Sequence, residues 1–70
     1  MGNFKIKNFK VGDVVYHLFH KEFRMIIVRL NNSRNELLCV WLDEDGEMQY
    51  LEMKPYDLGK VSDLNQNISA

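Results

Sequence analysis

The chain has 70 residues, which allows one small domain, and its 46% share of apolar residues is enough for a packed core. A net charge of −1 gives the whole chain little long-range attraction to nucleic acid. No apolar run approaches the roughly 20 residues that span a bilayer, the first residues lack the apolar segment of a signal peptide, and the single cysteine, Cys39, excludes an intrachain disulfide. We therefore expect a cytoplasmic protein with no membrane contact.

Four short apolar runs indicate an all-β domain, because β-branched and aromatic residues fit a pleated surface and hairpin-sized gaps separate the runs. Residues 1–9 are predicted to be an N-terminal arm or a lead-in strand, and residues 10–61 the folded domain. Within that domain the pattern predicts strands at residues 14–18, 25–30, 36–42 and 48–54, with residues 19–24 as a connecting loop. The polar residues 62–70 are predicted to be a frayed tail.

Turn chemistry supports this order of strands. The asparagine-rich segment 31–35 favours a hairpin turn, and Asp45-Gly46 supplies the positive φ that the next hairpin needs. Pro55 ends the fourth strand, after which residues 56–58 can form one 3₁₀ turn and residues 59–61 a short closing strand. We expect about five antiparallel strands, closed into a small barrel.

The third strand, residues 36–42, is apolar at both odd and even positions, whereas a half-exposed strand would alternate. Either its hairpin is the buried centre of the barrel, or its outer face is covered by the N-terminal arm or by a second copy of the protein. The first strand also leaves two alternatives open. Its inward face is either Val14, Tyr16 and Leu18 or Val15 and His17, because a shift of one residue exchanges the two sets.

Several short motifs together resemble the small bacterial YodC-like proteins, a family of unknown function. They are Gly12-Asp13-Val14-Val15, Met25-Ile26-Ile27, Cys39-Val40-Trp41 with Asp43, and Asp57-Leu58. The resemblance covers about residues 10–61 and implies a five-stranded SH3-like barrel; the Gly-Asp opening is also similar to the KOW motif of ribosomal and transcription-associated barrels. The family usually has a Gly-Gly-Pro type loop before its methionine, whereas this chain has the glycine-free residues 19–24.

Charge is distributed unevenly along the chain. Residues 1–34 carry seven Lys or Arg against two Asp or Glu, a net charge of +5, and residues 35–70 carry two against eight, a net charge of −6. Such asymmetry can mark a surface for nucleic acid or for an acidic partner. Alternatively, opposite charges from the two halves pair across neighbouring strands.

Candidate metal and catalytic sites are weak. His17 and His20 form a His-x-x-His pattern but lack the further ligands that zinc needs. Asp43-x-Asp45-Gly46 lacks the remaining oxygen ligands of a calcium loop. The chain offers no serine-nucleophile or phosphate-loop motif, and Cys39 has no neighbouring cation that would stabilise its thiolate. We predict no enzyme activity, no metal and no cofactor.

Binding remains as the expected function. The leading hypothesis is a non-enzymatic module that binds a protein partner or a second copy of itself as a homodimer, through an interface at Leu38, Val40, Trp41 and Tyr50. The alternative is nucleic-acid binding, since stacking aromatics lie beside cations in a basic-aromatic loop and in the N-terminal arm. The residues predicted for that contact are Lys5, Lys7, Lys10, Phe19, Lys21, Phe23 and Arg24.

Overall fold

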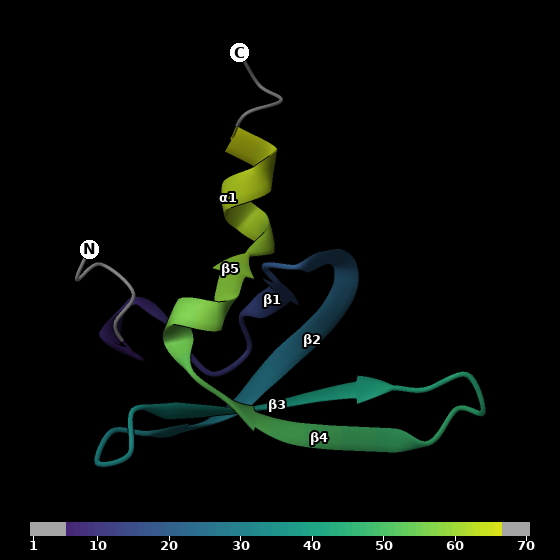
Figure 1. The fold of residues 1–70 in the computed structure, drawn as a ribbon, viewed down its shortest axis with the longest axis horizontal. Coiled ribbons are helices and arrows are strands. Elements are labelled where there is room, and N and C mark those ends of the chain that lie inside the picture. The colour runs from purple at the N-terminus through teal and green to yellow at the C-terminus, as the bar shows by residue number, and fades with distance from the viewer. Residues whose placement is uncertain (1–5, 67–70) are drawn as a thin grey trace.

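A computed structural model describes residues 6–66 of the chain. Its elements, in chain order, are η1 (Ile6–Asn8), β1 (Val14–His17), β2 (His20–Asn31), β3 (Glu36–Leu42), β4 (Met48–Met53), η2 (Pro55–Asp57), β5 (Leu58–Lys60) and α1 (Val61–Gln66). The five strands form one antiparallel sheet in the order β4-β3-β2-β1-β5 (Figure 1). The prediction of an all-β domain of about five antiparallel strands with a single 3₁₀ turn before the last strand is confirmed.

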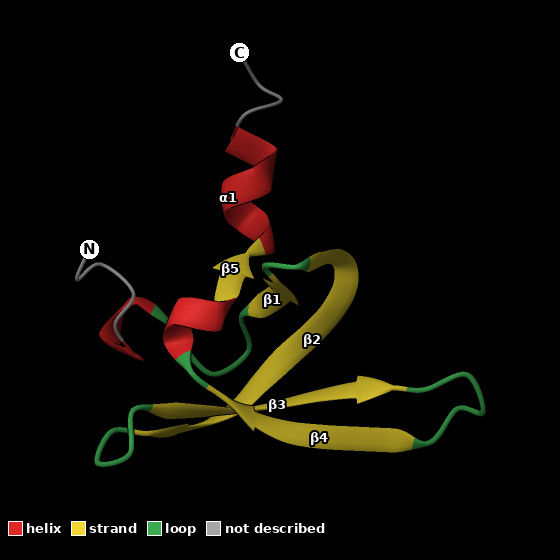
Figure 2. Cartoon of the chain, viewed as in Figure 1, coloured by secondary structure: helices red, strands yellow, loops and turns green. Residues whose placement is uncertain are grey.

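The long strand β2 joins two parts of the sheet. Its first half pairs with β1, and its second half pairs with β3 from Ile26 to Asn31. Residues 20–25 of β2, which precede Ile26, diverge from the β3–β4 hairpin (Figure 2). β4 and β5 are the two ends of the sheet, and no pairing within residues 6–66 joins them to close a barrel.

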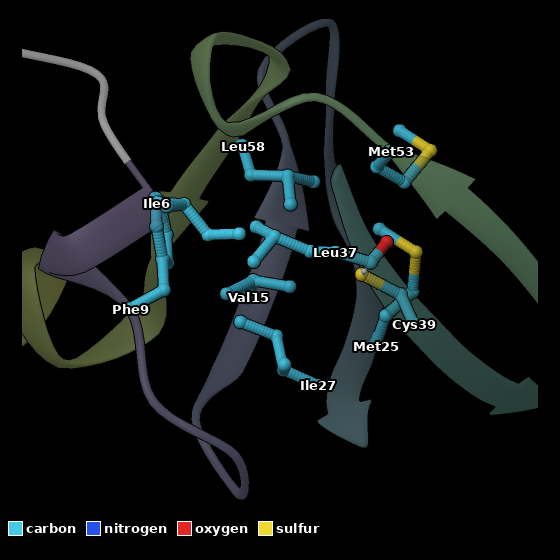
Figure 3. Packing of buried hydrophobic residues seen from close by; sticks show 9 residues of the cluster. All are labelled: Ile6, Phe9, Val15, Met25, Ile27, Leu37, Cys39, Met53 and Leu58. Carbon is cyan, nitrogen blue, oxygen red and sulfur yellow. Dashed lines mark hydrogen bonds between the residues drawn. The ribbon is translucent and has the colours of Figure 1, made fainter. Parts of the chain in front are cut away.

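The core lies on one face of this sheet. Its fully buried side chains include Val15 of β1, Met25 and Ile27 of β2, and Leu37 and Cys39 of β3 (Figure 3). These residues occupy alternate positions on β2 and β3, as a one-sided pleated sheet requires. Met53 and Leu58 complete the cluster at the end of β4 and the start of β5.

The N-terminal arm also contributes to the core. Ile6 and Phe9 are only 9% and 5% exposed and belong to the same apolar cluster as Val15 and Leu58. The described part of the arm, residues 6–9, therefore lies against the inner face rather than over the outer face of the β3–β4 hairpin. It contains the 3₁₀ turn η1 and no strand.

A close approach between Tyr16 of β1 and Gly59 of β5 explains why β1 is also buried on the face opposite the core. Tyr16 lies opposite Gly59 and is only 8% exposed, although it points to the face opposite Val15. A Cβ atom at Gly59 would collide with the ring of Tyr16, so glycine leaves the space that the ring occupies. The inward face of β1 is thus the one that carries Val15 and His17, with Val15 in the core and His17 half-buried, while Val14 is exposed and Tyr16 is buried on the opposite face.

Several boundaries differ from the predictions. β1 ends at His17, one residue early, and η2 and β5 each begin one residue earlier than predicted. Residues 20–24 belong to β2 and not to a loop, although the register between β1 and β2 shifts there, so that Tyr16 faces Arg24 and His17 faces His20. β4 ends at Met53. Residues 61–66 form the short helix α1, whereas the last part of the predicted frayed tail lies outside the described residues. No helix within residues 6–66 is long and apolar enough to cross a membrane.

Candidate interaction surface

An apolar row crosses four strands on the outer face of the sheet, opposite the core. Val14 of β1 lies opposite Ile26 of β2. Val40 of β3 lies between Ile26 and Tyr50 of β4. Val14 is 42% exposed, Ile26 46% and Tyr50 66%, while Val40 is half-buried between its neighbours. Cross-strand pairing therefore brings together apolar side chains from strands that are far apart in the sequence.

A second pair extends this row toward the β3–β4 turn. Leu42 lies opposite Met48, and the two side chains are 66% and 62% exposed. We call these six residues the outer patch: Val14, Ile26, Val40, Leu42, Met48 and Tyr50. The solvent-facing side of an antiparallel sheet normally carries polar residues, and contiguous exposed apolar patches mark interaction sites.

A groove of about 640 Å³ lies where β2 diverges from β3, and it is continuous with the outer patch. Phe23 and Trp41 line it, with ring centroids 5.0 Å apart and ring planes at 78°. Its charged lining residues are Glu22 and Arg24. The rings of Phe23 and Trp41 meet between β2 and β3 next to the Ile26–Val40 pair, where the pairing of the two strands ends.

The free edge of β4 borders the outer patch. The hairpin is closed by the Asp43 N–H, which donates to the Glu47 carbonyl oxygen at 2.9 Å. In an antiparallel ladder, hydrogen-bonded pairs alternate with non-hydrogen-bonded pairs, so Gln49 and Leu51 also direct their backbone groups toward β3. The backbone groups of Met48, Tyr50 and Glu52 consequently point away from the sheet, where they can pair with an added strand.

The β3–β4 turn at the start of β4 is strongly acidic. It carries the carboxylates of Asp43, Glu44, Asp45 and Glu47. Asp43 is held within the turn, because its Oδ1 accepts the N–H groups of Asp45 and Glu47 at 2.9 Å each and its Oδ2 accepts the Gln49 side-chain amide at 2.9 Å. These hydrogen bonds, led by the Glu47 N–H, lower the pKa of Asp43. The Asp43 carboxylate therefore stays negatively charged at neutral pH.

Cations gather at the other end of β4. Lys54 Nζ lies 3.3 Å from Glu36 and donates a hydrogen bond to the Arg34 carbonyl oxygen at 3.0 Å. Arg34 Nε also lies 3.3 Å from Glu36. Partial burial opposes ionisation of Glu36, but Lys54 and Arg34 outweigh it and lower the pKa of this carboxyl. The cluster links residues of both halves of the chain, as does the Lys60–Asp13 ion pair at 3.6 Å.

The predicted interface residues fall on two faces. Leu38, Val40 and Tyr50 lie on the outer face, whereas Trp41 is on the inner face, half-buried against Phe23 and the core. Sequence reasoning did not single out Val14, Ile26, Leu42 and Met48 as surface residues. The apolar residues at both odd and even positions of β3 indicated an apolar outer face. The register that aligns the four strands, however, is known only from the structure.

The residues predicted to contact nucleic acid lie at opposite ends of the β1–β2 pair. Phe19 is 81% exposed at the β1–β2 turn, and Lys21 and Arg24 follow it on β2. Phe23 is half-buried against Trp41, and the Nε of Arg24 donates to the Lys21 carbonyl oxygen. Lys7 and Lys10 are exposed near the other end of β1, where the Gly12 N–H donates to the Ile27 carbonyl oxygen; Lys5 lies outside the described residues.

His17 and His20 are neighbours across the β1–β2 turn, with ring centroids 5.8 Å apart. The Nδ1 of His17 accepts the Phe19 backbone N–H at 3.1 Å, which engages one ring nitrogen in the turn. Across residues 6–66, no group of three or more His, Cys, Asp or Glu side chains is arranged to hold a metal ion.

Comparison of the chain with protein-family models, with curated proteins and with solved structures found no match. The resemblance to the YodC-like family therefore stays a prediction from the sequence motifs.

We expect Cys39 to react slowly with alkylating reagents. It is fully buried on β3, and burial raises the pKa of its thiol from 9.0 to about 11. At pH 8 the thiolate fraction, and with it the alkylation rate, should be about 100-fold lower than for an ordinary cysteine. The rate should rise about tenfold per pH unit and reach that of a free thiol in urea. A fast native rate, measured by mass spectrometry, would contradict the burial of Cys39.

Proposed function

We propose that this protein is a non-enzymatic binding module that engages a protein partner through the outer patch and the adjoining free edge of β4. The observation that carries the proposal is the apolar row Val14–Ile26–Val40–Tyr50, which remains open to solvent beside unpaired backbone groups. A partner strand can add to such an edge while its side chains pack against the neighbouring apolar residues.

Energetics support an interaction role for this surface. Burying apolar area contributes about 25 cal/mol per Å², so the six partly or largely exposed apolar side chains of the outer patch leave a driving force for association unused in the isolated domain. A long, flat, apolar edge strand is usually protected by proline, lysine or a bulge. The six residues of β4 contain neither proline nor lysine, and its pairing with β3 is regular from Met48 to Met53.

Nucleic-acid binding has weaker support. The two basic-aromatic clusters do not merge into one surface, and Phe23 is occupied by its contact with Trp41. The exposed ring of Phe19 beside Lys21 is the remaining candidate for base stacking.

We also propose an SH3-like barrel as the fold type and the cytoplasm as the compartment. The strand order β4-β3-β2-β1-β5 and the 3₁₀ turn between β4 and β5 support the first proposal. The single buried thiol supports the second, because free cysteines are typical of reducing compartments.

Photocrosslinking distinguishes the two binding hypotheses. A benzophenone amino acid replaces Tyr50 in one variant and Phe19 in another, and each variant is irradiated in the cell that produces the protein. Both positions are exposed, at 66% and 81%, so they are matched in accessibility. We expect discrete protein adducts at position 50, identified by mass spectrometry, and few at position 19. Nucleic-acid adducts at position 19 together with none at position 50 would overturn the proposed function.

A further inference from the structure

We infer that the partner of this surface is a second copy of the same chain, joined through antiparallel pairing of β4 with the partner's β4 across a two-fold axis near Tyr50. The inference rests on the proposed function and names its partner. Self-pairing would extend the five-stranded sheet into one continuous sheet of two copies, with the outer patches side by side on one face.

The backbone of β4 is compatible with this pairing. The outward-directed groups of β4 belong to Met48, Tyr50 and Glu52, which are related by symmetry about Tyr50. In an antiparallel pair centred there, Tyr50 faces the partner's Tyr50, and Met48 faces the partner's Glu52. Every outward N–H and carbonyl group of this segment then meets a complementary group, and the edge that favours non-specific association is removed.

The charges at the two ends of β4 favour the antiparallel direction and a partner like itself. β4 begins after the acidic turn, which holds Asp43, Glu44, Asp45 and Glu47, and it ends beside the cations Lys54 and Arg34, which flank the carboxylate of Glu36. Antiparallel pairing of two copies sets each acidic turn against the less negative end of the other copy, where Lys54 lies. Parallel pairing would set the two acidic turns against each other, which costs free energy.

The exposed side chains of β4 fit an added strand on both faces. Met48 and Tyr50 are exposed on the outer face, and Leu51 is 54% exposed on the inner face. In the proposed pair the two Tyr50 rings are cross-strand neighbours, an arrangement that stabilises antiparallel strands. The other end of the sheet is a poorer site, because β5 has three residues and continues directly into α1.

A charge-swap experiment tests the pairing. In the first variant, Glu44→Lys, Asp45→Lys and Glu47→Lys leave Asp43 as the one carboxylate of the turn and make the turn basic; in the second, Lys54→Glu makes the far end of β4 acidic. Each variant alone sets like charges against each other at both contacts, so we expect the dimer dissociation constant to rise about tenfold. An equimolar mixture sets opposite charges at both contacts. We therefore expect native mass spectrometry to show a heterodimer in excess over either homodimer.

Controls separate association from folding. Lys7→Glu changes the charge of η1, far along the chain from β4, and should leave the dimer unchanged. Lys54→Glu removes an ion-pair partner of Glu36, so thermal unfolding of each variant is needed to verify that the domain is intact. Hydrogen exchange of the unsubstituted protein tests the same pairing without any variant. With increasing protein concentration, the amides of Met48, Tyr50 and Glu52 should gain protection while the Phe19 amide does not.

Three results would contradict the self-pairing. Sedimentation of the unsubstituted protein as a monomer at millimolar concentration would exclude a second copy as the partner, while adducts of other proteins at position 50 would still support the proposed function. A dimer whose mixed variants show no heterodimer preference, or one without protection of the β4 amides, would exclude pairing through β4. A protein that stays monomeric at millimolar concentration and yields no adduct at position 50 would overturn the proposed function itself.

Discussion

Replacing Ile27 with alanine is expected to unfold most of the protein at room temperature. Ile27 of β2 is completely buried in the core cluster, and its strand lies between β1 and β3. Truncating a buried isoleucine to alanine costs about 2–5 kcal/mol, because transfer free energy is lost and a cavity is left. A domain of this size has only a few kcal/mol of stability to lose. Circular dichroism and urea denaturation measure the effect.

Ile26→Ala is the matched control, since it makes the same chemical change one position earlier. Ile26 is 46% exposed in the outer patch, and we expect a loss well under half of that seen for Ile27→Ala. The folded Ile26→Ala protein should instead yield fewer protein adducts from the benzophenone at position 50. Equal destabilisation by the two substitutions would contradict the assignment of inner and outer faces on β2.

The second large effect is expected for Trp41→Ala, which should reduce the free energy of unfolding by about 3 kcal/mol. Trp41 lies on the inner face of β3, and its ring meets the ring of Phe23 edge to face at 5.0 Å. Removing it would leave the space between the diverging strands β2 and β3 unfilled. Chemical denaturation of the purified protein gives the value.

A double-mutant cycle tests the physical basis of that loss. Phe23→Ala and Trp41→Ala should be coupled by about 0.5–1.5 kcal/mol, the range for aromatic pairs. The matched control pairs Phe23→Ala with Leu42→Ala, because Leu42 follows Trp41 on β3 but is 66% exposed on the other face. That second pair should be additive. A Trp41→Ala protein with unchanged stability would show that the indole is free for an interface instead.

The turns were the most predictable parts of the fold. Asp45-Gly46 forms the expected hairpin turn, with Gly46 at a φ of 81°, because only a residue without a Cβ atom adopts this conformation at little cost. Asn35 at a φ of 55° ends the asparagine-rich turn, where its short polar side chain tolerates the left-handed region. Pro55 ends the extended segment and begins η2, since its ring cannot continue a hydrogen-bonded strand.

The segment of residues 19–24 shows where local pattern fails. Its polar and charged residues are typical of a loop, yet the β1–β2 turn is short and residues 20–24 continue as strand. Tertiary contact decides this case: Phe23 is held against Trp41, which lies 18 residues further along the chain. Nothing within the segment indicates that partner.

The candidate surface was predicted only in part for a related reason. Strand β3 is apolar at both its odd and its even positions. This pattern indicated two apolar faces, but it could not assign either face to the core. The placement of Ile6 and Phe9 on the inner face made that assignment, since it left Val40 and Tyr50 open to solvent among the described residues.

The sequence by itself determined the four main strand segments and the turns, because strand propensity, glycine at positive φ and proline act over a few residues. It also determined the uneven charge, with the acidic turn at one end of β4 and Lys54 at the other. Only the tertiary structure decided the register that joins Val14, Ile26, Val40 and Tyr50 into one row, and the divergence of β2 from β3. Such pairings depend on the combined packing of all five strands, and a shift of one residue would place each of these side chains on the opposite face.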